Sequence, residues 1–383
     1  MRQSVIYLDY AAATPIDTQV FATMQPYLSE RFYNPSATYA VAEAVRGDIE
    51  AARARVAHWL GVRPVEVVFT AGGTEANNLA IRGVLAQFPG STMVTTAIEH
   101  ESVLATAHEF GARVAPVSAE GVVDRAALAK LISDQTVLVS VMYANNEVGT
   151  IQPIRQIAQT LESIRKSRAK LGNQLPLYLH TDAAQAGNYL DLHAARLGVD
   201  LLTVNAGKIY GPKQTGALFV AAHVRLHPQI TGGGQERAMR SGTENVAGIV
   251  GFAAALDMVQ SSRREETARI AGLQRLFFDL LAEKLPRAVV NGSRKTRLPN
   301  NVHVTFPGQD NERLIFALDE AGIQCAAGSA CSASSEEPSH VLRAMGLSDA
   351  DARASLRFTF GRHTTEKDIR HVIDTLRTLT VTD

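Results

Sequence analysis

Segments typical of buried β-strands alternate with segments of helical periodicity over the first two thirds of the chain. The strand-like runs are rich in β-branched residues and cover residues 65–70, 92–97, 136–143, 177–180, 199–204 and 215–221. The helical patterns cover residues 41–60, 74 onward, 124–132 and 153 to about 168. This alternation predicts an α/β fold in which helices cover both faces of a mostly parallel sheet.

Polar residues follow the predicted strands at the points where the strands end. Because the carboxyl ends of parallel strands meet at one edge of a sheet, where open α/β sheets bind ligands, we expect these residues to form one site. They are Thr74, His100, Asn146, Asp182, Gln185 and Lys208.

Lys208 lies in a tight turn directly after the apolar run 199–204. Small residues precede it, and Gly211-Pro212 redirects the chain after it. The amine is thereby held on a stiff support, as a lysine that forms a Schiff base requires. The alternative for a single lysine in a loop is an ordinary solvated surface residue.

The segment Thr70-Ala-Gly-Gly-Thr74 joins a predicted strand to a predicted helix. Free backbone N–H groups and the helix dipole at such a junction favour a bound anion. The glycine spacing fits neither a Walker loop nor a dinucleotide-binding fingerprint. A plain helix with Thr74 as its N-cap explains the same residues equally well.

Composition limits the class of protein. Of the 383 residues 46% are hydrophobic, and 38 basic residues balance 38 acidic ones, so no excess of positive charge favours nucleic acid or a membrane surface. No apolar run reaches transmembrane length, and the first residues are too soon polar for a signal peptide. Two cysteines are too few for a disulfide framework or a structural zinc site, so we expect free thiols in the reducing cytoplasm.

The two cysteines, Cys325 and Cys331, have different sequence surroundings. Residues 326–338 are rich in Ala, Ser, Gly and Glu without any periodicity, which predicts a mobile loop around Cys331. An incidental exposed thiol is the alternative for this residue. Cys325 ends an apolar run and is predicted to be a buried strand residue.

The chain is expected to divide into two domains. Residues 16–260 form the large domain, and residues 1–15 and 261–383 form a smaller α+β domain that carries the loop at about residues 326–338. The long helical pattern at residues 245–285 is interpreted as the connector between them. Thr365 and Asp368 have the spacing of a capping box at the start of the last helix.

Asp182 and Lys208 together suggest the cofactor pyridoxal 5'-phosphate (PLP). The lysine can form an imine with it, and a carboxylate beside the pyridine nitrogen keeps that nitrogen protonated. Gly73 and Thr74 would bind the phosphate, and His100 would cover the ring. Taken alone, Asp182 could equally be a helix cap or a surface carboxylate, and His100 a hydrogen-bonded core histidine.

A series of ordered motifs closely resembles the cysteine desulfurases, in the class V aminotransferase branch of the fold type I PLP enzymes. The resemblance implies a large domain with a mostly parallel seven-stranded sheet flanked by helices, a smaller α+β C-terminal domain, and a homodimer. The motifs extend over nearly the whole chain and are Tyr7-Leu-Asp-Tyr10, Asn34-Pro-Ser36, Phe69-Thr-Ala-Gly-Gly-Thr-Glu75, Glu99-His100, Asn145-Asn-Glu-Val-Gly149, Thr181-Asp-Ala-Ala-Gln185, Lys208-Ile-Tyr-Gly-Pro-Lys213, Gly232-Gly-Gly-Gln-Glu236, Arg240-Ser-Gly-Thr243, Gly328-Ser-Ala-Cys331 and Ser355-Leu-Arg-Phe358.

The resemblance also implies how the cofactor is held. Lys208 would bind PLP and later move the Cα proton of the substrate cysteine. Asp182 would pair with the pyridine nitrogen, Gln185 would reach the ring hydroxyl, and His100 would stack on the ring and handle protons. The full set of implied cofactor-binding residues is Gly73, Thr74, His100, Asn146, Asp182, Gln185, Asn205, Lys208 and Thr243, the last from a second subunit.

For the substrate, the resemblance implies that Arg357, with Asn146 and Asn34, grips the carboxylate, since an arginine fork matches a carboxylate. Cys331 would attack the substrate sulfur and leave a persulfide on the enzyme and L-alanine as product. The implied catalytic residues are therefore Cys331, Lys208 and His100, without a metal. The sulfur would pass to an iron–sulfur scaffold protein or to tRNA thiolation.

The chain departs from the family pattern beside Lys208. Family members commonly carry Ser-x-His there, and both side chains help to hold the phosphate, whereas this chain has Asn205 and Gly207. We therefore expect weaker PLP retention but not loss of activity. Longer relatives also carry a tail that docks the scaffold protein, whereas this sequence ends at Asp383. The sequence therefore does not predict which surface would dock the scaffold.

Two other interpretations are weighed against a cysteine desulfurase. One is a selenocysteine lyase or another class V PLP enzyme, such as a small-amino-acid aminotransferase, which needs no thiol at position 331. The other is a non-catalytic sulfur carrier or scaffold-binding protein that kept the fold, for which Gly207 is the only support.

Overall fold

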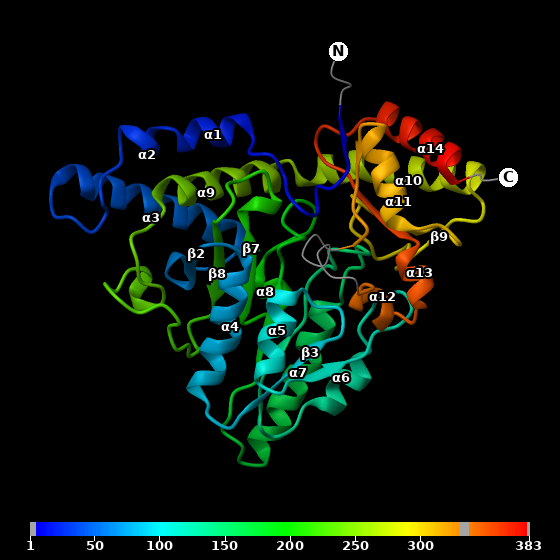
Figure 1. Ribbon diagram of the computed structural model, residues 1–383. Coiled ribbons are helices and arrows are strands. Elements are labelled where there is room, and N and C mark those ends of the chain that lie inside the picture. The colour runs from blue at the N-terminus through cyan, green and yellow to red at the C-terminus, as the bar shows by residue number, and fades with distance from the viewer. Residues whose placement is uncertain (1–4, 329–336, 381–383) are drawn as a thin grey trace.

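A computed structural model describes residues 5–328 and 337–380 of the chain (Figure 1). A seven-stranded sheet forms its centre, in the order β2-β8-β7-β6-β5-β3-β4. The strands from β4 to β7 are parallel neighbours, whereas β8 runs antiparallel to both β7 and β2, so the expected mostly parallel sheet is confirmed. The strands are β2 (Val67–Thr70), β3 (Thr92–Thr96), β4 (Arg113–Ala115), β5 (Thr136–Ser140), β6 (Tyr178–Asp182), β7 (Leu201–Asn205) and β8 (Gly216–Val220).

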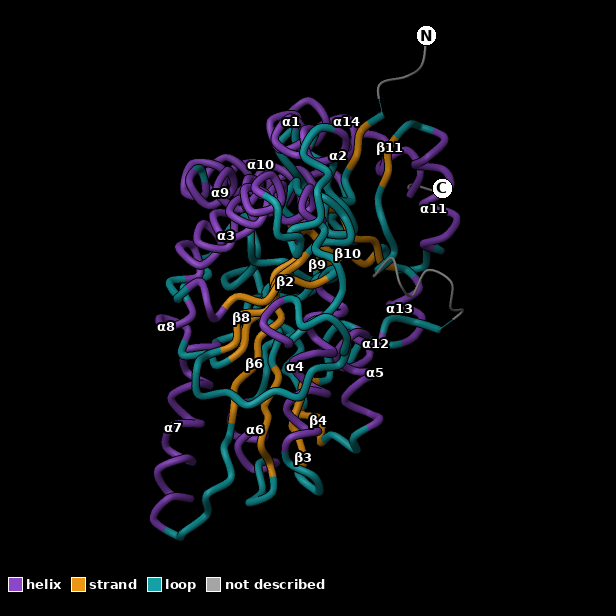
Figure 2. Tube along the Cα trace, turned by 90° about the vertical axis from the view of Figure 1, so that its left-hand side faces the viewer, coloured by secondary structure: helices purple, strands orange, loops and turns teal. Residues whose placement is uncertain are grey.

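Helices cover both faces of this sheet, because successive side chains of a strand point to opposite faces. Leu202 and Val204 of β7 pack in one core with α3 (Ala40–Leu60), α7 (Ile154–Lys170) and α9 (Val246–Ser261). Leu201 packs in a second core with α4 (Gly73–Gln87) and α5 (Glu101–Glu109). Figure 2 shows α7 on one side of the strands and α5 on the other. The remaining helices of this part are α1 (Thr18–Met24), α2 (Pro26–Ser29), α6 (Arg125–Leu131) and α8 (Ala194–Leu197).

The helical pattern at residues 245–285 is two helices rather than one. α9 ends at Ser261 and α10 (Arg263–Lys284) begins after Ser262. Figure 1 shows the two helices crossing the molecule from the large sheet to the C-terminal unit. α9 packs on α3, and α10 packs on α14 (Glu366–Thr380).

The C-terminal unit has a three-stranded antiparallel sheet, and the start of the chain joins it. β1 (Ile6–Tyr7) pairs in parallel with β11 (Ile323–Gln324), and Leu8 lies in the same hydrophobic core as β10 and β12. The predicted domain boundary at residue 260 stays a prediction. The other elements of this unit are β9 (Val289–Val290), β10 (Asn301–Thr305), α11 (Asn311–Glu320), α12 (His340–Ala344), α13 (Asp349–Arg353) and β12 (Ser355–Thr359).

Local predictions are tested by the ends of these elements. The capping box before α14 is confirmed: Thr365 N–H donates to Asp368 Oδ2 at 2.8 Å, and Asp368 N–H donates to Thr365 Oγ1 at 3.3 Å. Cys325 was predicted to be a buried strand residue, which is wrong in detail, because it is only half-buried and follows the end of β11. Burial, with a smaller contribution from Asp9, raises the pKa of the Cys325 thiol to about 12.

Within residues 5–328 and 337–380, no helix has the length and apolar character needed to span a membrane.

Candidate active site

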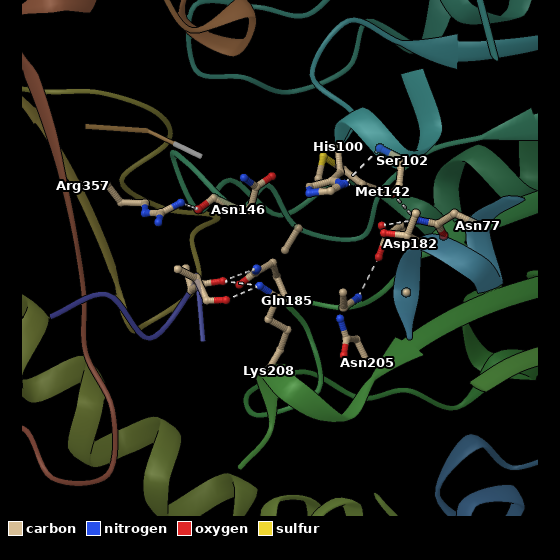
Figure 3. A pocket seen from close by; sticks show the side chains of 16 residues that line it. Asn77, His100, Ser102, Met142, Asn146, Asp182, Gln185, Asn205, Lys208 and Arg357 are labelled. Carbon is tan, nitrogen blue, oxygen red and sulfur yellow. Dashed lines mark hydrogen bonds between the residues drawn. The ribbon is translucent and has the colours of Figure 1, made fainter. Parts of the chain in front are cut away.

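A cavity lies where the central strands end (Figure 3). It gathers all six of the polar residues that were predicted to share the carboxyl edge of the sheet. Its lining consists of Ala11, Ala12, Gly73, Thr74, Asn77, His100, Ser102, Met142, Ala144, Asn146, Asp182, Ala184, Gln185, Asn205, Lys208 and Arg357.

Lys208 is held in this cavity by the turn after β7. It ends a short 3-10 helix, η2 (Ala206–Lys208), and its own carbonyl accepts a hydrogen bond from Asn188 Nδ2 at 2.7 Å. Its Nζ donates to Ala12 O at 2.6 Å and to Ala11 O at 3.0 Å. The alternative of a solvated surface lysine is therefore wrong.

Asp182 ends β6 and is only 7% exposed, so it is neither a surface carboxylate nor a simple helix cap. Its Oδ2 accepts a hydrogen bond from Asn77 Nδ2 at 2.7 Å, and its Oδ1 accepts one from the Ala184 N–H at 2.9 Å. These two donors fix the plane of the carboxylate at the edge of the cavity (Figure 3).

His100 lies at the start of α5, where it is the N-cap residue. Its Nδ1 accepts a hydrogen bond from the Ser102 N–H at 3.1 Å and lies 2.9 Å from Ser102 Oγ. The ring lines the cavity, so His100 is not a core histidine buried away from the site.

The junction between β2 and α4 is open to an anion. α4 begins at Gly73, and its N-cap is Gly72, with φ 119° and no capping side chain. The alternative that Thr74 caps the helix is therefore wrong, because Thr74 lies inside the first turn. Without a capping side chain, the N–H groups of this turn keep their capacity for a ligand.

Asn205 and Gly207 stand close to this junction. A Cβ built on Gly73 would lie 3.4 Å from Asn205 Nδ2, so the start of α4 and the end of β7 approach each other closely. Asn205 Oδ1 accepts a hydrogen bond from the Gly207 N–H at 3.0 Å. A Cβ built on Gly207 would meet only ordinary contacts, the nearest at 3.5 Å from Asn205 Oδ1.

Gln185, Asn146 and Arg357 complete the opposite side of the cavity. Gln185 Nε2 donates to Ala11 O at 3.0 Å. Arg357 is 1% exposed, and its Nη1 donates to Asn146 O at 3.0 Å. Its Nη2 donates to Asp9 Oδ1 at 2.6 Å, while its Nε has no acceptor among the described residues. These two contacts use two of the five N–H groups of the guanidinium, so three are left, among them the buried Nε–H.

Two predicted site residues do not line this cavity. Asn34 is exposed in a turn, where its Oδ1 accepts a hydrogen bond from the Ser36 N–H at 2.9 Å. Thr243 is exposed as well, so the expectation that it serves a second subunit stays a prediction.

Cys331 lies outside the described residues, but the described chain on both sides of residues 329–336 contacts Glu147. A Cβ built on Gly328 would lie 3.2 Å from Glu147 Oε2. Ser339 Oγ donates to the same oxygen at 2.5 Å. Glu147 is buried and follows Asn146, which lines the cavity.

Sequence reasoning missed Asn77, Ser102 and Met142 as lining residues. Asn77 lies one turn after Thr74 on α4, and Ser102 lies two residues after His100 on α5. Both residues face the cavity because α4 and α5 begin at the edge of the sheet where the cavity lies. The first turn of each helix that follows a predicted strand was therefore the sequence signal that could have identified them.

Two fully buried titratable groups lie next to this site without adding charge to it. Burial lowers the pKa of His180 to about 4, so the ring is neutral between Ser140 Oγ at 2.8 Å and Thr203 Oγ1 at 3.1 Å. Burial raises the pKa of Glu99 to about 8, so this carboxyl is mainly protonated at neutral pH. Its Oε1 accepts from Thr96 Oγ1 at 2.7 Å and from the Met142 N–H at 2.8 Å.

Comparison with known proteins agrees with this arrangement. The sequence profile of the family described as Aminotransferase class-V matches residues 6–372. The chain belongs to this family. It is 39% identical over 378 residues to the cysteine desulfurase IscS of Dictyoglomus turgidum, with 97% of this chain and 93% of that relative covered. It is 38% identical over 377 residues to the cysteine desulfurase IscS 1 of Archaeoglobus fulgidus, with 97% and 95% covered.

Two solved structures share the fold. A NifS-like protein superposes with a TM-score of 0.90 at 31% identity, covering 98% of this chain and 99% of that one. A structure of SspA in complex with cysteine superposes with a TM-score of 0.80 at 33% identity, covering 94% and 100%. The resemblance to the cysteine desulfurases, and the fold class that it implied, are confirmed.

Proposed function

We propose that the protein is a PLP-dependent cysteine desulfurase, which converts L-cysteine to L-alanine and transfers the sulfur to Cys331 as a persulfide. One observation carries the proposal. Lys208, Asp182, His100 and Arg357 come from separate parts of the chain and line a single cavity.

The donor set of the cavity fits PLP. The uncapped first turn of α4 at Gly73 and Thr74 suits its phosphate, and Asn205 lies close enough to assist. Asp182 suits the pyridine nitrogen, because a buried carboxylate beside it favours its protonated form. When bound, PLP would supply an electron sink for bonds that break at the substrate Cα.

The side chains around that group have distinct tasks in the proposal. Lys208 holds the cofactor and then moves the Cα proton, since its amine already lies in the cavity. Gln185 reaches the ring hydroxyl and His100 covers the ring. Arg357 and Asn146 orient the substrate carboxylate. Arg357 lines the cavity and has N–H groups beyond those donated to Asn146 O and Asp9, which supports this role.

Cys331 is proposed as the nucleophile that accepts sulfur. Its thiolate attacks the substrate sulfur, the carbon–sulfur bond of the substrate breaks, and the sulfur stays on Cys331 as a persulfide. The substrate Cβ takes a proton, and L-alanine leaves. The positions of Gly328 and Ser339 support this role, because the chain on both sides of Cys331 contacts Glu147, the residue after Asn146 of the cavity lining.

A second copy of the chain belongs to the proposal. Thr243 is exposed, and we assign it to the phosphate site of a partner subunit in a homodimer. The predicted contact of Asn34 with the substrate carboxylate has no support from this cavity, which Asn34 does not line. The persulfide would serve an iron–sulfur scaffold or tRNA thiolation in the cytoplasm.

Gly207→His is expected to lower the dissociation constant for PLP by about fivefold, the ratio that one added hydrogen bond of about 1 kcal/mol provides. The space around Gly207 admits the new Cβ without a clash. Titration of the apoprotein with PLP, followed by absorbance, measures the change. Gly207→Ala is the matched control, because it adds the Cβ without a donor. Equal affinities for the histidine and alanine variants would contradict the proposed deficit at this position.

Incubation with L-cysteine tests the function as a whole, with alanine and sulfide measured together for the wild type and Cys331→Ser. We expect the wild type to form both products in the presence of a reductant and Cys331→Ser to form neither above background. Alanine formation that persists in Cys331→Ser would rule out the persulfide route and favour another class V activity. Selenocysteine as a parallel substrate distinguishes a selenocysteine lyase. A wild type without bound PLP or products would instead indicate a non-catalytic sulfur carrier.

A further inference from the structure

The hydrogen bonds of His100 determine which of its nitrogens carries the proton. A backbone N–H can only donate, so the contact from the Ser102 N–H at 3.1 Å requires a lone pair on His100 Nδ1. A neutral imidazole carries one proton, which must then lie on Nε2. Figure 3 shows the other ring nitrogen on the side of the ring away from Ser102.

The Ser102 hydroxyl reinforces the same tautomer, and Asn77 sets its direction. Asn77 Nδ2 lies 2.9 Å from Ser102 Oγ and can only donate, so the hydroxyl oxygen accepts from it. The hydroxyl hydrogen is then available to His100 Nδ1, 2.9 Å away. Nδ1 thus receives two donors from one residue.

The same amide connects this pair to the Asp182 carboxylate on the same side of the cavity (Figure 3). Asn77 Nδ2 also donates to Asp182 Oδ2 at 2.7 Å, and Asn77 is 1% exposed. The chain of contacts runs from Asp182 through Asn77 and Ser102 to His100 (Figure 3). The donor and the acceptor of each hydrogen bond in this chain are determined, because a carboxylate can only accept a hydrogen bond and an amide nitrogen can only donate one.

We propose that Ser102 and Asn77 are positioning residues that hold neutral His100 with its proton on Nε2, so that the ring meets the cavity as a proton donor. In this arrangement Lys208 removes protons and His100 supplies one. The inference deepens the proposed function and depends on it for the role of His100. The tautomer itself depends only on the contacts described above.

Nitrogen-15 NMR of the histidine-labelled full-length apoprotein tests the tautomer without any turnover. At about pH 8.5, where an ordinary histidine is neutral, the couplings between ring nitrogens and ring protons identify the protonated nitrogen. His100→Gln assigns the signal among the 11 histidines. We expect protonated Nε2 in the wild type. Protonated Nδ1 would overturn the inference, whether or not the holoenzyme forms alanine.

Variants at position 102 test the contribution of the hydroxyl. In Ser102→Ala the backbone donor remains and the hydroxyl donor is lost, so we expect the ratio of the two tautomers to move about fivefold toward Nδ1–H. In the holoenzyme kcat for alanine formation should fall by about the same factor, with KM for L-cysteine within twofold. Ser102→Thr keeps the hydroxyl and should restore both values.

Two further variants separate positioning from general loss of structure. Thr106→Val removes another buried hydroxyl of α5, which contacts the Ser102 carbonyl and Asn78 Oδ1 but neither the Ser102 hydroxyl nor His100, and it should leave the His100 signal and kcat unchanged. Asn77→Leu should move the His100 signal in the same direction as Ser102→Ala and, by releasing Asp182, also weaken PLP binding. A wild-type signal and wild-type kcat in Ser102→Ala would overturn the role of Ser102. A wild type that forms no alanine, but shows protonated Nε2, would refute the proposed function and leave the tautomer assignment intact.

Discussion

Replacement of Lys208 by alanine is expected to lower alanine formation from L-cysteine by at least about 10³-fold, within the range that loss of a general base causes. The variant loses the covalent anchor of PLP and the proposed base together, because Lys208 is the lysine that lines the cavity among the described residues. The amine is also well placed for both tasks, since Ala11 O and Ala12 O hold it at 3.0 and 2.6 Å. Purified wild type should be yellow, and the visible absorption of the variant should change and be lost on gel filtration.

A lysine elsewhere on the same edge of the molecule provides the control for Lys208→Ala. Lys213 is exposed and lies five residues further along, beside the neighbouring surface hollow, so Lys213→Ala should keep the absorption and most of the activity. Retained colour after gel filtration of Lys208→Ala would mean that another amine holds the cofactor. Retained turnover would mean that another group acts as the base.

The central sheet and most of the cavity were predictable because their signals are local. A run of β-branched residues followed by a turn predicts a strand and its end, and parallel strands share one edge. For this reason Asp182, Lys208 and His100 were placed together correctly from the sequence alone. The burial of Leu201 and Leu202 on opposite faces of β7 likewise follows from the two-residue period of a strand.

The contacts that sequence reasoning missed join distant segments or occur within helices. β1 pairs with β11 more than 300 residues away, and the residue pattern of neither strand predicts this pairing. Asn77 looks like any polar helical residue until α4 is packed against β6, where its amide meets Asp182. Thr74 was weighed as an N-cap because a hydroxyl residue commonly takes that place, whereas the chain begins α4 at Gly73.

The ion pair between Asp9 and Arg357 is the contact of this kind that most affects the proposed chemistry. The two residues are separated by nearly the whole chain, and β1 brings Asp9 to the arginine by pairing with β11. Nη1 and Nη2 are both engaged within the protein, at Asn146 O and at Asp9. A substrate carboxylate would therefore meet an arginine whose orientation is already fixed, which reduces the entropy lost on binding.

Arg357→Leu is expected to raise KM for L-cysteine by about 10- to 100-fold, because a hydrogen bond to a charged group contributes about 1.5–3 kcal/mol. The absorption of bound PLP should stay unchanged, since Arg357 is assigned to the substrate and not to the cofactor. Steady-state alanine formation over a range of L-cysteine concentrations gives KM, and Arg343→Ala, at an exposed ion pair on α12, is the control.

Loss of stability must be separated from loss of binding, because Arg357→Leu leaves Asp9 without its partner in a largely buried position. The side chains of Arg357 and Asp9 are 1% and 18% exposed, and removal of one member of such a pair is destabilising. Asp9→Asn/Arg357→Leu removes the orphan charge, so it should unfold at a higher temperature than Arg357→Leu and keep the raised KM. A normal KM in a folded double variant would assign Arg357 to the architecture of β1 and β12 rather than to the substrate.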